Sequence, residues 1–336
     1  MTAPRTLTNG QTAYVERLLD LIAPKLERVE EELRRNFRSK IKTIDDVGDH
    51  ILGGGGKRIR PALLLLVSRM LRYDGYRDVV YAAVVEFIHT ATLVHDDIID
   101  AAEVRRGRTS VNYRWGNNLT VLVGDYIFMH SMHLALGEGN LDILRLLSDA
   151  TIRMIEGEIL GTEQNGRIDI SVDDYFDIVS RKTAGLFGAT CRIPGFLVDL
   201  PDAHTAALTN YGYNLGVCFQ LIDDLLDFTS TTEVLGKPAL SDLKEGKMTL
   251  PLILAMPRAS AREREIVAHV VSNKSFDGID PAEIVTIAHR YDTLDQTREI
   301  ARDYASRARM ALEPFPESPS KETLDLALDF VLEREK

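Results

Sequence analysis

Cysteine is nearly absent from this chain of 336 residues, which argues against a disulfide framework and against a cysteine-ligated zinc site. Only Cys191 and Cys218 occur, each in an apolar stretch, and neither belongs to a C-x-x-C pair or to a cysteine–histidine spacing typical of zinc sites. We therefore expect two buried free thiols rather than a disulfide framework, as is usual in a reducing compartment such as the cytoplasm.

Long apolar runs and an excess of basic residues are also missing. The stretch "PALLLLV", residues 61–67, is far shorter than the roughly 20 residues that a membrane span needs. The first ten residues are polar and indicate a tail rather than a secretion signal. The 40 basic side chains against 51 acidic ones give a net charge of −11, which excludes a general nucleic-acid partner. We expect a soluble, cytoplasmic protein without a transmembrane segment.

Alternating strand patterns are nearly absent, whereas helical periodicity runs through the whole chain. Apolar residues recur three and four apart in segments such as 14–37 and 141–164, and glycine, proline and asparagine mark the breaks between segments. We predict an all-α fold, a single large helical bundle with a central cavity, over residues 11–336 after a flexible tail at residues 1–10. From about Pro257 the chain is more charged, and we expect this part to pack outside the core.

Three aspartates lie together inside the apolar segment "LVHDDIID", residues 93–100. On a helix Asp96, Asp97 and Asp100 share one face, because they are spaced three and four residues apart. Ionised carboxylates crowded in this way among apolar neighbours need compensation, either by protonation or by divalent cations.

A second D-D-x-x-D pattern argues against a merely solvated acidic face. It consists of Asp223, Asp224 and Asp227 within the apolar segment "FQLIDDLLDF". Two such helices facing each other across a bundle would present both triplets to one cavity. Oxygen ligands alone suit a hard cation, and Mg²⁺ fits best when substrate phosphates complete its coordination. A di-iron site would need paired Glu-x-x-His motifs, and only Glu86 with His89 supplies one.

Basic residues gather next to glycines and apolar helices, where they could meet phosphate groups. "GGGGKRIRP" places them directly after a glycine run, which lets the backbone approach an anion closely. Others occur in "VRRGR", "SRKTAG" and "LGKPALSDLKEGK". In so acidic a chain these islands indicate phosphate binding. The basic residues concerned are Lys57, Arg58, Arg60, Arg105, Arg106, Lys182, Lys237, Lys244 and Lys247.

Five motifs, in order from about residue 50 to 255, resemble those of the all-trans polyprenyl diphosphate synthases. They are "GGGGKRIRP", "EFIHTATLVHDDIIDAAEVRRG", "GDYIF", "RKTAGLF" and "FQLIDDLLDF" with the following "LGKPALSDLKEGKMTLPLI". The resemblance implies the all-α isoprenoid synthase fold, a homodimer, and about three Mg²⁺ ions per active site. It is greatest to the long-chain type, similar to octaprenyl and solanesyl diphosphate synthases, which supply quinone side chains such as that of ubiquinone.

The resemblance implies a role for each matching position. Both acidic triplets correspond to metal-binding aspartates, and Asp96, Asp97, Asp100, Asp223, Asp224 and Lys182 to catalytic residues. The isopentenyl diphosphate pocket corresponds to Lys57, Arg60, His89 and Arg106, with Arg58 or Gly56 at its edge. The groups around the allylic diphosphate correspond to Arg105, Lys182, Thr183, Gln220, Lys237 and Lys247. The one departure is Leu240, where the family often has glycine, and it bears on the shape of that turn rather than on the ligands.

These residue types suit an ionisation followed by a condensation. The diphosphate that leaves the allylic carbon is neutralised by Mg²⁺ and lysines, and apolar walls keep water from the allylic cation. The double bond of isopentenyl diphosphate then attacks this cation. We expect the proton lost afterwards to go to the departing diphosphate, because no side chain is an obvious base.

Product length is predicted from the residues one helical turn before the first acidic triplet. Ala91 and Thr92 are small, whereas in the family a bulky aromatic residue at these places gives a farnesyl-length product. The open tunnel predicts a long chain. Phe128, Met129 and Met132 are the candidates for its floor.

Other interpretations fit part of the pattern. A shorter-chain synthase, making farnesyl or geranylgeranyl diphosphate, would carry the same motifs. An all-α terpene cyclase would also carry one D-D-x-x-D, but its second metal motif usually mixes Asn, Ser or Thr with Glu, and it needs no second diphosphate pocket. A non-catalytic partner subunit of a heteromeric synthase tends to lose aspartates, and this chain keeps both triplets.

Overall fold

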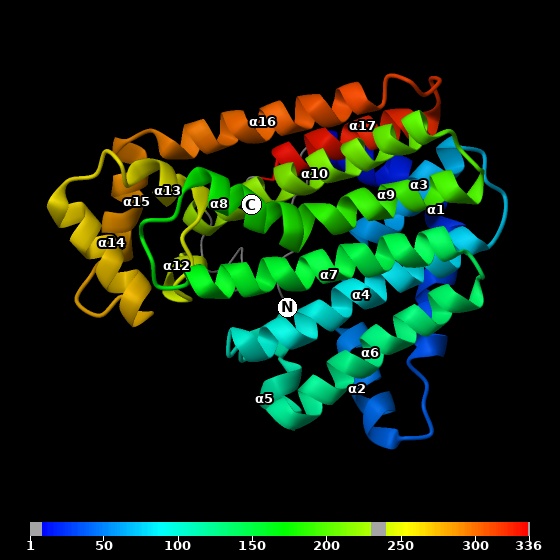
Figure 1. Cartoon of the computed structure of the whole chain (residues 1–336), viewed down its shortest axis with the longest axis horizontal. Helices are drawn as coiled ribbons and strands as arrows, with labels where there is room; N and C mark the ends of the chain where they lie inside the picture. Colours follow the sequence, from blue (N-terminus) through cyan, green and yellow to red (C-terminus); the bar gives the residue numbers. More distant parts are fainter. Residues whose placement is uncertain (1–8, 230–239, 335–336) are drawn as a thin grey trace.

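The computed structural model describes residues 9–229 and 240–334, and nearly all of their regular structure is helical. The first helices are α1 (Asn9–Asn36), α2 (Lys42–Gly53), α3 (Ile59–Met70), α4 (Arg77–Ile99), α5 (Val111–Trp115), α6 (Asn117–Gly137) and α7 (Leu141–Gln164). Those that follow are α8 (Val172–Val179), the π-helix η1 (Ser180–Ala184), α9 (Gly185–Leu197), α10 (Asp202–Thr229), α12 (Ser241–Lys244), α13 (Leu250–Ala255), α14 (Ala261–Asn273), α15 (Pro281–Arg290), α16 (Thr293–Ala311) and α17 (Pro319–Leu332). The long helices run side by side (Figure 1).

The predicted all-α class is confirmed. Helix α1 includes residues 14–36 of the first periodic segment and α7 all of the second, 141–164, and asparagine side-chain capping fixes the start of α7 at Leu141. The strands of the described residues are β1 (Val104–Arg105) and β2 (Arg108–Thr109), a short antiparallel hairpin after α4. Helix α1 begins inside the tail predicted for residues 1–10, of which residues 1–8 lie outside the described part. The single domain stays a prediction.

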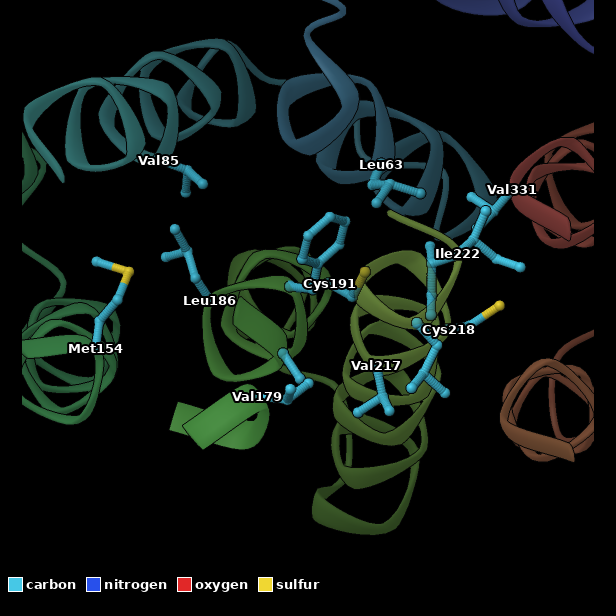
Figure 2. Close-up of a cluster of buried hydrophobic side chains, with 14 of the residues drawn as sticks. Leu63, Val85, Met154, Val179, Leu186, Cys191, Val217, Cys218, Ile222 and Val331 are labelled. Atoms are coloured by element: carbon cyan, nitrogen blue, oxygen red, sulfur yellow. The ribbon is translucent and has the colours of Figure 1, made fainter. Parts of the chain in front are cut away.

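The centre of the molecule is built from helices that are apolar on almost every face. Residues 61–67 of α3 are all buried, and α4 and α9 are buried over most of their length. Figure 2 shows Leu63 and Leu186 in one buried cluster with both cysteines. The prediction of buried free thiols is confirmed, since Cys191 and Cys218 are buried and unpaired.

The charged region after Pro257 is only partly peripheral. Helices α14 and α15 lie at one end of the molecule (Figure 1). Helix α16, however, packs along α10, and α17 packs against α1 and α3. Ala305, Leu324 and Leu328 belong to the same core. The prediction of packing outside the core is therefore wrong for α16 and α17, because their charged residues occupy one face while small and apolar residues on the other allow close contact.

Helix α6 is more apolar than expected of a chain predicted to have no transmembrane segment. Among the described helices it is the one long and apolar enough, by length and composition alone, to cross a membrane. Core helices of soluble proteins pass the same test, so this is weak support for a span. Only 33% of its most apolar stretch is buried within the chain, however, and α6 packs mainly against α4.

Candidate active site

A cavity of about 840 Å³ opens between the central helices and gathers most of the predicted substrate residues. The predicted residues that line it are Gly56, Lys57, Arg58, Arg60, His89, Thr92, Asp96, Arg106, Lys182, Thr183, Gln220 and Asp223. A smaller cavity of about 180 Å³ shares Lys182, Thr183 and Gln220 with it and adds Asp224 and Lys247. Residues from both predicted diphosphate sites therefore meet in one place.

The first acidic triplet occupies the end of α4, but its three carboxylates have different partners. Asp96 lines the cavity, and burial, reinforced by neighbouring carboxylates, raises its pKa to about 6. The buried Asp97 accepts a hydrogen bond from Arg105 Nε at 2.6 Å. Asp100 accepts one from Lys247 Nζ at 2.7 Å. Of the three, only Asp96 lines the large cavity directly.

The second triplet, near the end of α10, divides in the same way. Asp223 lines the large cavity and pairs with Arg334 at 3.5 Å. Asp224 is buried beside the small cavity, where Tyr175 Oη donates to it at 2.6 Å and Gln220 Nε2 at 2.9 Å. Burial raises the pKa of Asp224 to about 8. Asp224 therefore faces hydrogen-bond donors, whereas Asp223 faces the substrate cavity.

Asp227, the third member, organises the turn that leads to α12. Its carboxylate accepts hydrogen bonds from the Ser241 backbone N–H at 3.1 Å, the Ser241 hydroxyl at 2.8 Å and the Asp242 backbone N–H at 3.1 Å. Leu240 lies in the left-handed region, with φ 56°, and is fully buried. This conformation costs a leucine about 1–2 kcal/mol more than a glycine, and burying the side chain returns about as much. The turn thus keeps the left-handed residue that a glycine would provide.

The donor set fits a hard cation that a substrate completes. In the part of the chain that the structure describes, no three His, Cys, Asp or Glu side chains lie close enough to hold a metal by themselves. Asp96 and Asp223 nevertheless line the same cavity from two helices, and both offer carboxylate oxygens. The raised pKa of Asp96 marks a buried carboxylate that is not fully compensated. Mg²⁺ with water and diphosphate ligands suits this arrangement.

The glycine run after α2 delivers buried arginines to one end of the cavity. Arg58, with a left-handed φ of 49°, lies between Glu30 at 2.5 Å and Glu86 at 2.7 Å. Arg60 is partly buried with its guanidinium 4.4 Å from the centre of the Phe187 ring, and its buried Nε has no hydrogen-bond partner among the described residues. Burial lowers its pKa to about 10. An arginine whose buried nitrogen is unpaired is suited to an anionic ligand.

The β-hairpin carries two further arginines across this end. Arg105 pairs with Asp97 of α4, whereas Arg106 donates to the backbone carbonyl of Gly55 in the glycine run. Burial and the surrounding arginines hold the pKa of His89 well below its usual value, so its imidazole is neutral. His89 can therefore offer one donor and one acceptor without adding charge.

Glu86 belongs to this site, although in the sequence it stands out only as half of a Glu-x-x-His motif. It is 3% exposed, lines the cavity and pairs with Arg58. Its charge also favours the charged forms of Arg60 and Arg106. The signal in the sequence was an acidic residue inside an apolar helix, one turn from His89. The structure gives it arginines as partners rather than a metal cluster.

The π-helix η1 brings Lys182 and Thr183 to the cavity. Gly157 of α7 lets this segment approach, because a Cβ atom at that position would lie 2.7 Å from the Lys182 backbone nitrogen. Lys182 pairs with Glu158, and Thr183 Oγ1 donates to Gln220 Oε1 at 3.0 Å. π-Helical turns occur frequently at functional sites. Glu158, which lines both cavities, was missed because nothing local distinguishes it from a solvated helix residue.

Of the predicted diphosphate-site residues Lys237 and Lys247, the structure describes only Lys247. Lys247 lines the small cavity and pairs with Asp100 and, at 2.8 Å, with Glu245. Lys237 lies outside the described residues, so its role stays a prediction.

Most of the residues predicted to set product length do not line the cavity. Thr92 lines it, whereas Ala91 is buried in the core. Phe128 and Met132 pack against the core, and Met129 is 62% exposed; none of the three lines this cavity, so their place at the floor stays a prediction. Helix α6 turns much of its apolar surface outward, which periodicity alone could not show. The apolar lining comes instead from Leu93, Ile99, Met154, Ile155, Ile159, Phe187 and Phe219.

Aspartates from two helices, buried arginines and an apolar wall around one cavity define a class of protein. It is an all-α enzyme that binds phosphorylated substrates with apolar bodies. The comparisons make the class specific: residues 41–287 match the family described as polyprenyl synthetase, and the chain belongs to that family.

Relatives and solved structures cover almost the whole chain. The octaprenyl diphosphate synthase of Escherichia coli is 35% identical over 311 residues, which are 92% of this chain and 96% of that protein. A decaprenyl diphosphate synthase from Rhodobacter capsulatus has a TM-score of 0.90 at 35% identity, covering 96% and 99% of the two chains. A polyprenyl synthase from Caulobacter crescentus, complexed with calcium and isoprenyl diphosphate, has a TM-score of 0.90 at 34% identity, covering 99% and 100%. The predicted family, and with it a prenyl-transferring enzyme, is confirmed.

Proposed function

We propose that this protein elongates all-trans prenyl chains. It condenses isopentenyl diphosphate onto an allylic diphosphate, releases diphosphate and makes a long-chain polyprenyl diphosphate. The observation that carries the proposal is the single cavity lined by Asp96 and Asp223 from two helices, by the partly buried Arg60 and by an apolar wall. The octaprenyl and decaprenyl diphosphate synthases among the similar proteins support a long product over a farnesyl or geranylgeranyl one.

The allylic diphosphate binds at the end of the cavity where η1 meets the two acidic helices. Lys182 and Thr183 from η1, Gln220 from α10 and Lys247 contact its oxygens, and Arg105 holds Asp97 beside them. Asp96, Asp100 and Asp223 are the aspartates placed to hold Mg²⁺, about three ions in all, and Asp97, Asp224 and Asp227 orient the surroundings through the hydrogen bonds described above. Bound Mg²⁺ supplies Lewis-acid stabilisation of the leaving diphosphate. The calcium in the Caulobacter structure supports a divalent cation.

Isopentenyl diphosphate binds at the arginine end. Lys57, Arg60, His89 and Arg106 surround its phosphates, while Glu86 keeps these cations together before the substrate arrives. Two bound diphosphates hold the reacting carbons close together, so a bimolecular step becomes effectively unimolecular.

The reaction breaks one C–O bond and forms one C–C bond. The allylic carbon loses its diphosphate, and the rings of Phe187 and Phe219, with centres 5.6 Å apart, line the cavity where positive charge develops. The double bond of isopentenyl diphosphate attacks this carbon, and the diphosphate takes the proton that is then lost. The product is again an allylic diphosphate, so the cycle can repeat.

We further infer a homodimer that works in the cytoplasm and supplies the side chain of a quinone such as ubiquinone. The two buried free cysteines suit a reducing compartment. The quinone role follows from the proposed product, because a long prenyl chain is what anchors a quinone ring in a bilayer.

One assay tests the proposal. Purified protein is incubated with Mg²⁺, labelled isopentenyl diphosphate and farnesyl diphosphate, and the products are separated by chain length. We expect long-chain products whose formation EDTA abolishes. Products that stop at geranylgeranyl diphosphate would favour a short-chain synthase, a cyclic hydrocarbon would favour a terpene cyclase, and no EDTA-sensitive incorporation would overturn the transferase.

A further inference from the structure

Glu158 places a negative charge where the proposed reaction binds an anion. The large and the small cavity share four lining residues, Glu158, Lys182, Thr183 and Gln220. Three of the four are basic or neutral and suit the oxygens of the allylic diphosphate. The fourth is a carboxylate, which repels a diphosphate at close range. Glu158 therefore opposes the binding of the substrate that its neighbours attract.

The packing of α7 against η1 fixes the position of Glu158. It follows Gly157, where a Cβ atom would lie only 2.7 Å from the Lys182 backbone nitrogen. The side chain of Glu158 is 21% exposed, compared with 50% for that of Glu156 on the same helix. Glu158 thus belongs to the wall of the two cavities and not to the solvated face of α7.

Lys182 is shared between Glu158 and the first acidic triplet. Its Nζ forms an ion pair with the Glu158 carboxylate. After burial, the two largest influences on the pKa of Asp96 are Lys182, which lowers it, and Glu158, which raises it. Both side chains therefore lie near Asp96, and one lysine offsets two carboxylates. At neutral pH the three side chains together keep a net negative charge.

The other described lysine of the allylic site has the same kind of partners. Lys247 Nζ pairs with Asp100 at 2.7 Å and with Glu245 at 2.8 Å. Each lysine is thus held between an aspartate of the first triplet and a glutamate outside both triplets. Of the two glutamates, Glu158 lines both cavities and Glu245 lines neither. Glu158 is therefore the one placed to act on a bound diphosphate.

Mg²⁺ changes this balance of charge. Free diphosphate is a polyanion, and to contact Lys182 it must displace Glu158 and then remain beside that carboxylate and Asp96. A diphosphate that binds together with Mg²⁺ brings cations for both carboxylates, because Mg²⁺ prefers carboxylate, water and phosphate oxygens as ligands. Lys182 can then leave Glu158 and donate to the diphosphate.

We propose that Glu158 makes Mg²⁺ a condition of diphosphate binding. Without the metal, Glu158 repels diphosphate and retains Lys182, and bound Mg²⁺ relieves both effects. The inference rests on the prenyl transfer proposed above and deepens it. Metal-free allylic diphosphate lacks the Lewis acid that helps its C–O bond to ionise, and Glu158 keeps this unreactive form out of the site. Glu158 is thus a specificity-determining residue.

Calorimetric titration with inorganic diphosphate tests this role. Glu158→Gln and Glu158→Ala remove the charge, and Glu158→Asp keeps it. Each variant and the wild type are titrated once with Mg²⁺ and once with EDTA, and thermal unfolding without ligand shows which variants are folded. Glu156→Gln is the matched control, because Glu156 also connects α7 to η1, through Arg181 at 2.6 Å, but lines neither cavity.

We expect both neutral Glu158 variants to bind diphosphate in EDTA about tenfold more tightly than the wild type, which corresponds to about 1.4 kcal/mol. With Mg²⁺ their affinity should not rise, because the metal already compensates the carboxylate. Glu158→Asp and Glu156→Gln should keep the wild-type dependence on Mg²⁺. Either neutral variant suffices for the test if the other does not fold.

Three results would overturn the proposal. One is a lower Tm in Glu158→Gln and Glu156→Gln alike with unchanged dependence on Mg²⁺, since Glu158 would then only connect two helices. Another is equal tightening with Mg²⁺ and with EDTA, and the third is a wild type that binds diphosphate equally well in both. If the wild type binds diphosphate only with Mg²⁺ but incorporates no isopentenyl diphosphate, the prenyl transfer fails instead, and the titrations still decide the role of Glu158.

Discussion

Replacing Glu86 by glutamine should lower the stability against unfolding of the substrate-free protein more than that of the protein with isopentenyl diphosphate bound. Glu86 is 3% exposed, accepts a hydrogen bond from Arg58 at 2.7 Å and favours the charged forms of Arg60 and Arg106. Glutamine keeps the shape of the side chain but removes its charge, so the repulsion among the three arginines is no longer offset by Glu86. Arg58 then keeps only Glu30 as an acidic partner. The phosphates of the substrate supply the missing negative charge.

The size of the loss follows from the burial of the pair. Removing one partner of a buried ion pair costs about 3–5 kcal/mol. We expect about 2–3 kcal/mol for Glu86→Gln, because Arg58 retains Glu30 and the glutamine oxygen can keep a hydrogen bond. A chain of 336 residues has an unfolding entropy of about 0.7 kcal/mol/K, so Tm should fall by roughly 3–4 °C.

Thermal unfolding with and without isopentenyl diphosphate measures the effect. The substrate should raise Tm more in Glu86→Gln than in the wild type, and thus restore most of the loss. Glu32→Gln is the matched control, because Glu32 is also 3% exposed and accepts a hydrogen bond from Tyr76 Oη at 2.6 Å, but it does not line the cavity. Glu32→Gln should lower Tm, but the substrate should raise its Tm by no more than it raises that of the wild type. Equal substrate-induced shifts in both variants and the wild type would refute a charge-balancing role for Glu86.

Three further predictions concern the cavity itself. Thr92→Phe should shorten the product, since Thr92 lines the cavity one turn, about 6 Å, before Asp96; an unchanged length distribution would contradict this. Gly157→Ala should lower the free energy of unfolding by about 1–3 kcal/mol and also lower kcat, because the new Cβ would lie 2.7 Å from the Lys182 backbone nitrogen. Gly161→Ala is the control, because its new Cβ would have its nearest atom at 3.8 Å, and it should change neither quantity. Thermal unfolding and turnover measure both variants. Because the pKa of Asp96 is raised to about 6, Mg²⁺-dependent binding of inorganic diphosphate should weaken as the pH falls below about 6; calorimetric titration should find this slope reduced in Asp96→Asn.

The helices and the acidic triplets could be predicted because they depend on local spacing. A period near 3.6 places α7 at its observed residues, and D-D-x-x-D on a helix places three carboxylates on one side. Spacing could not show that Asp97 turns to Arg105. That contact depends on a reversal of the chain after α4, which includes Ala101 and Arg106 in left-handed conformations. Such reversals are set by the tertiary structure rather than by the apolar pattern.

The wall of the cavity could not be predicted for a different reason. Helix α6 is apolar on more than one face, so periodicity does not say which face is turned inward. Met129 therefore looked like a floor residue, although it is 62% exposed. The wall residues Ile155 and Ile159 and the carboxylate of Glu158 come from α7, more than 50 residues after Asp96 along the chain. Only the packing of both α4 and α7 against α9 brings them to one cavity.

In the proposed mechanism, the short β-hairpin also determines the distance between the two substrates. Arg105 and Arg106 are consecutive, yet one pairs with the acidic end of α4 and the other reaches the glycine run. One peptide unit, about 3.8 Å between Cα atoms, therefore connects the two diphosphate sites. We therefore expect the hairpin to act as a spacer that sets how far apart the reacting carbons are held, independently of how tightly each diphosphate binds. A one-residue insertion here would leave both substrates bound but too far apart to join, whereas the number of units added is decided at the far, apolar wall.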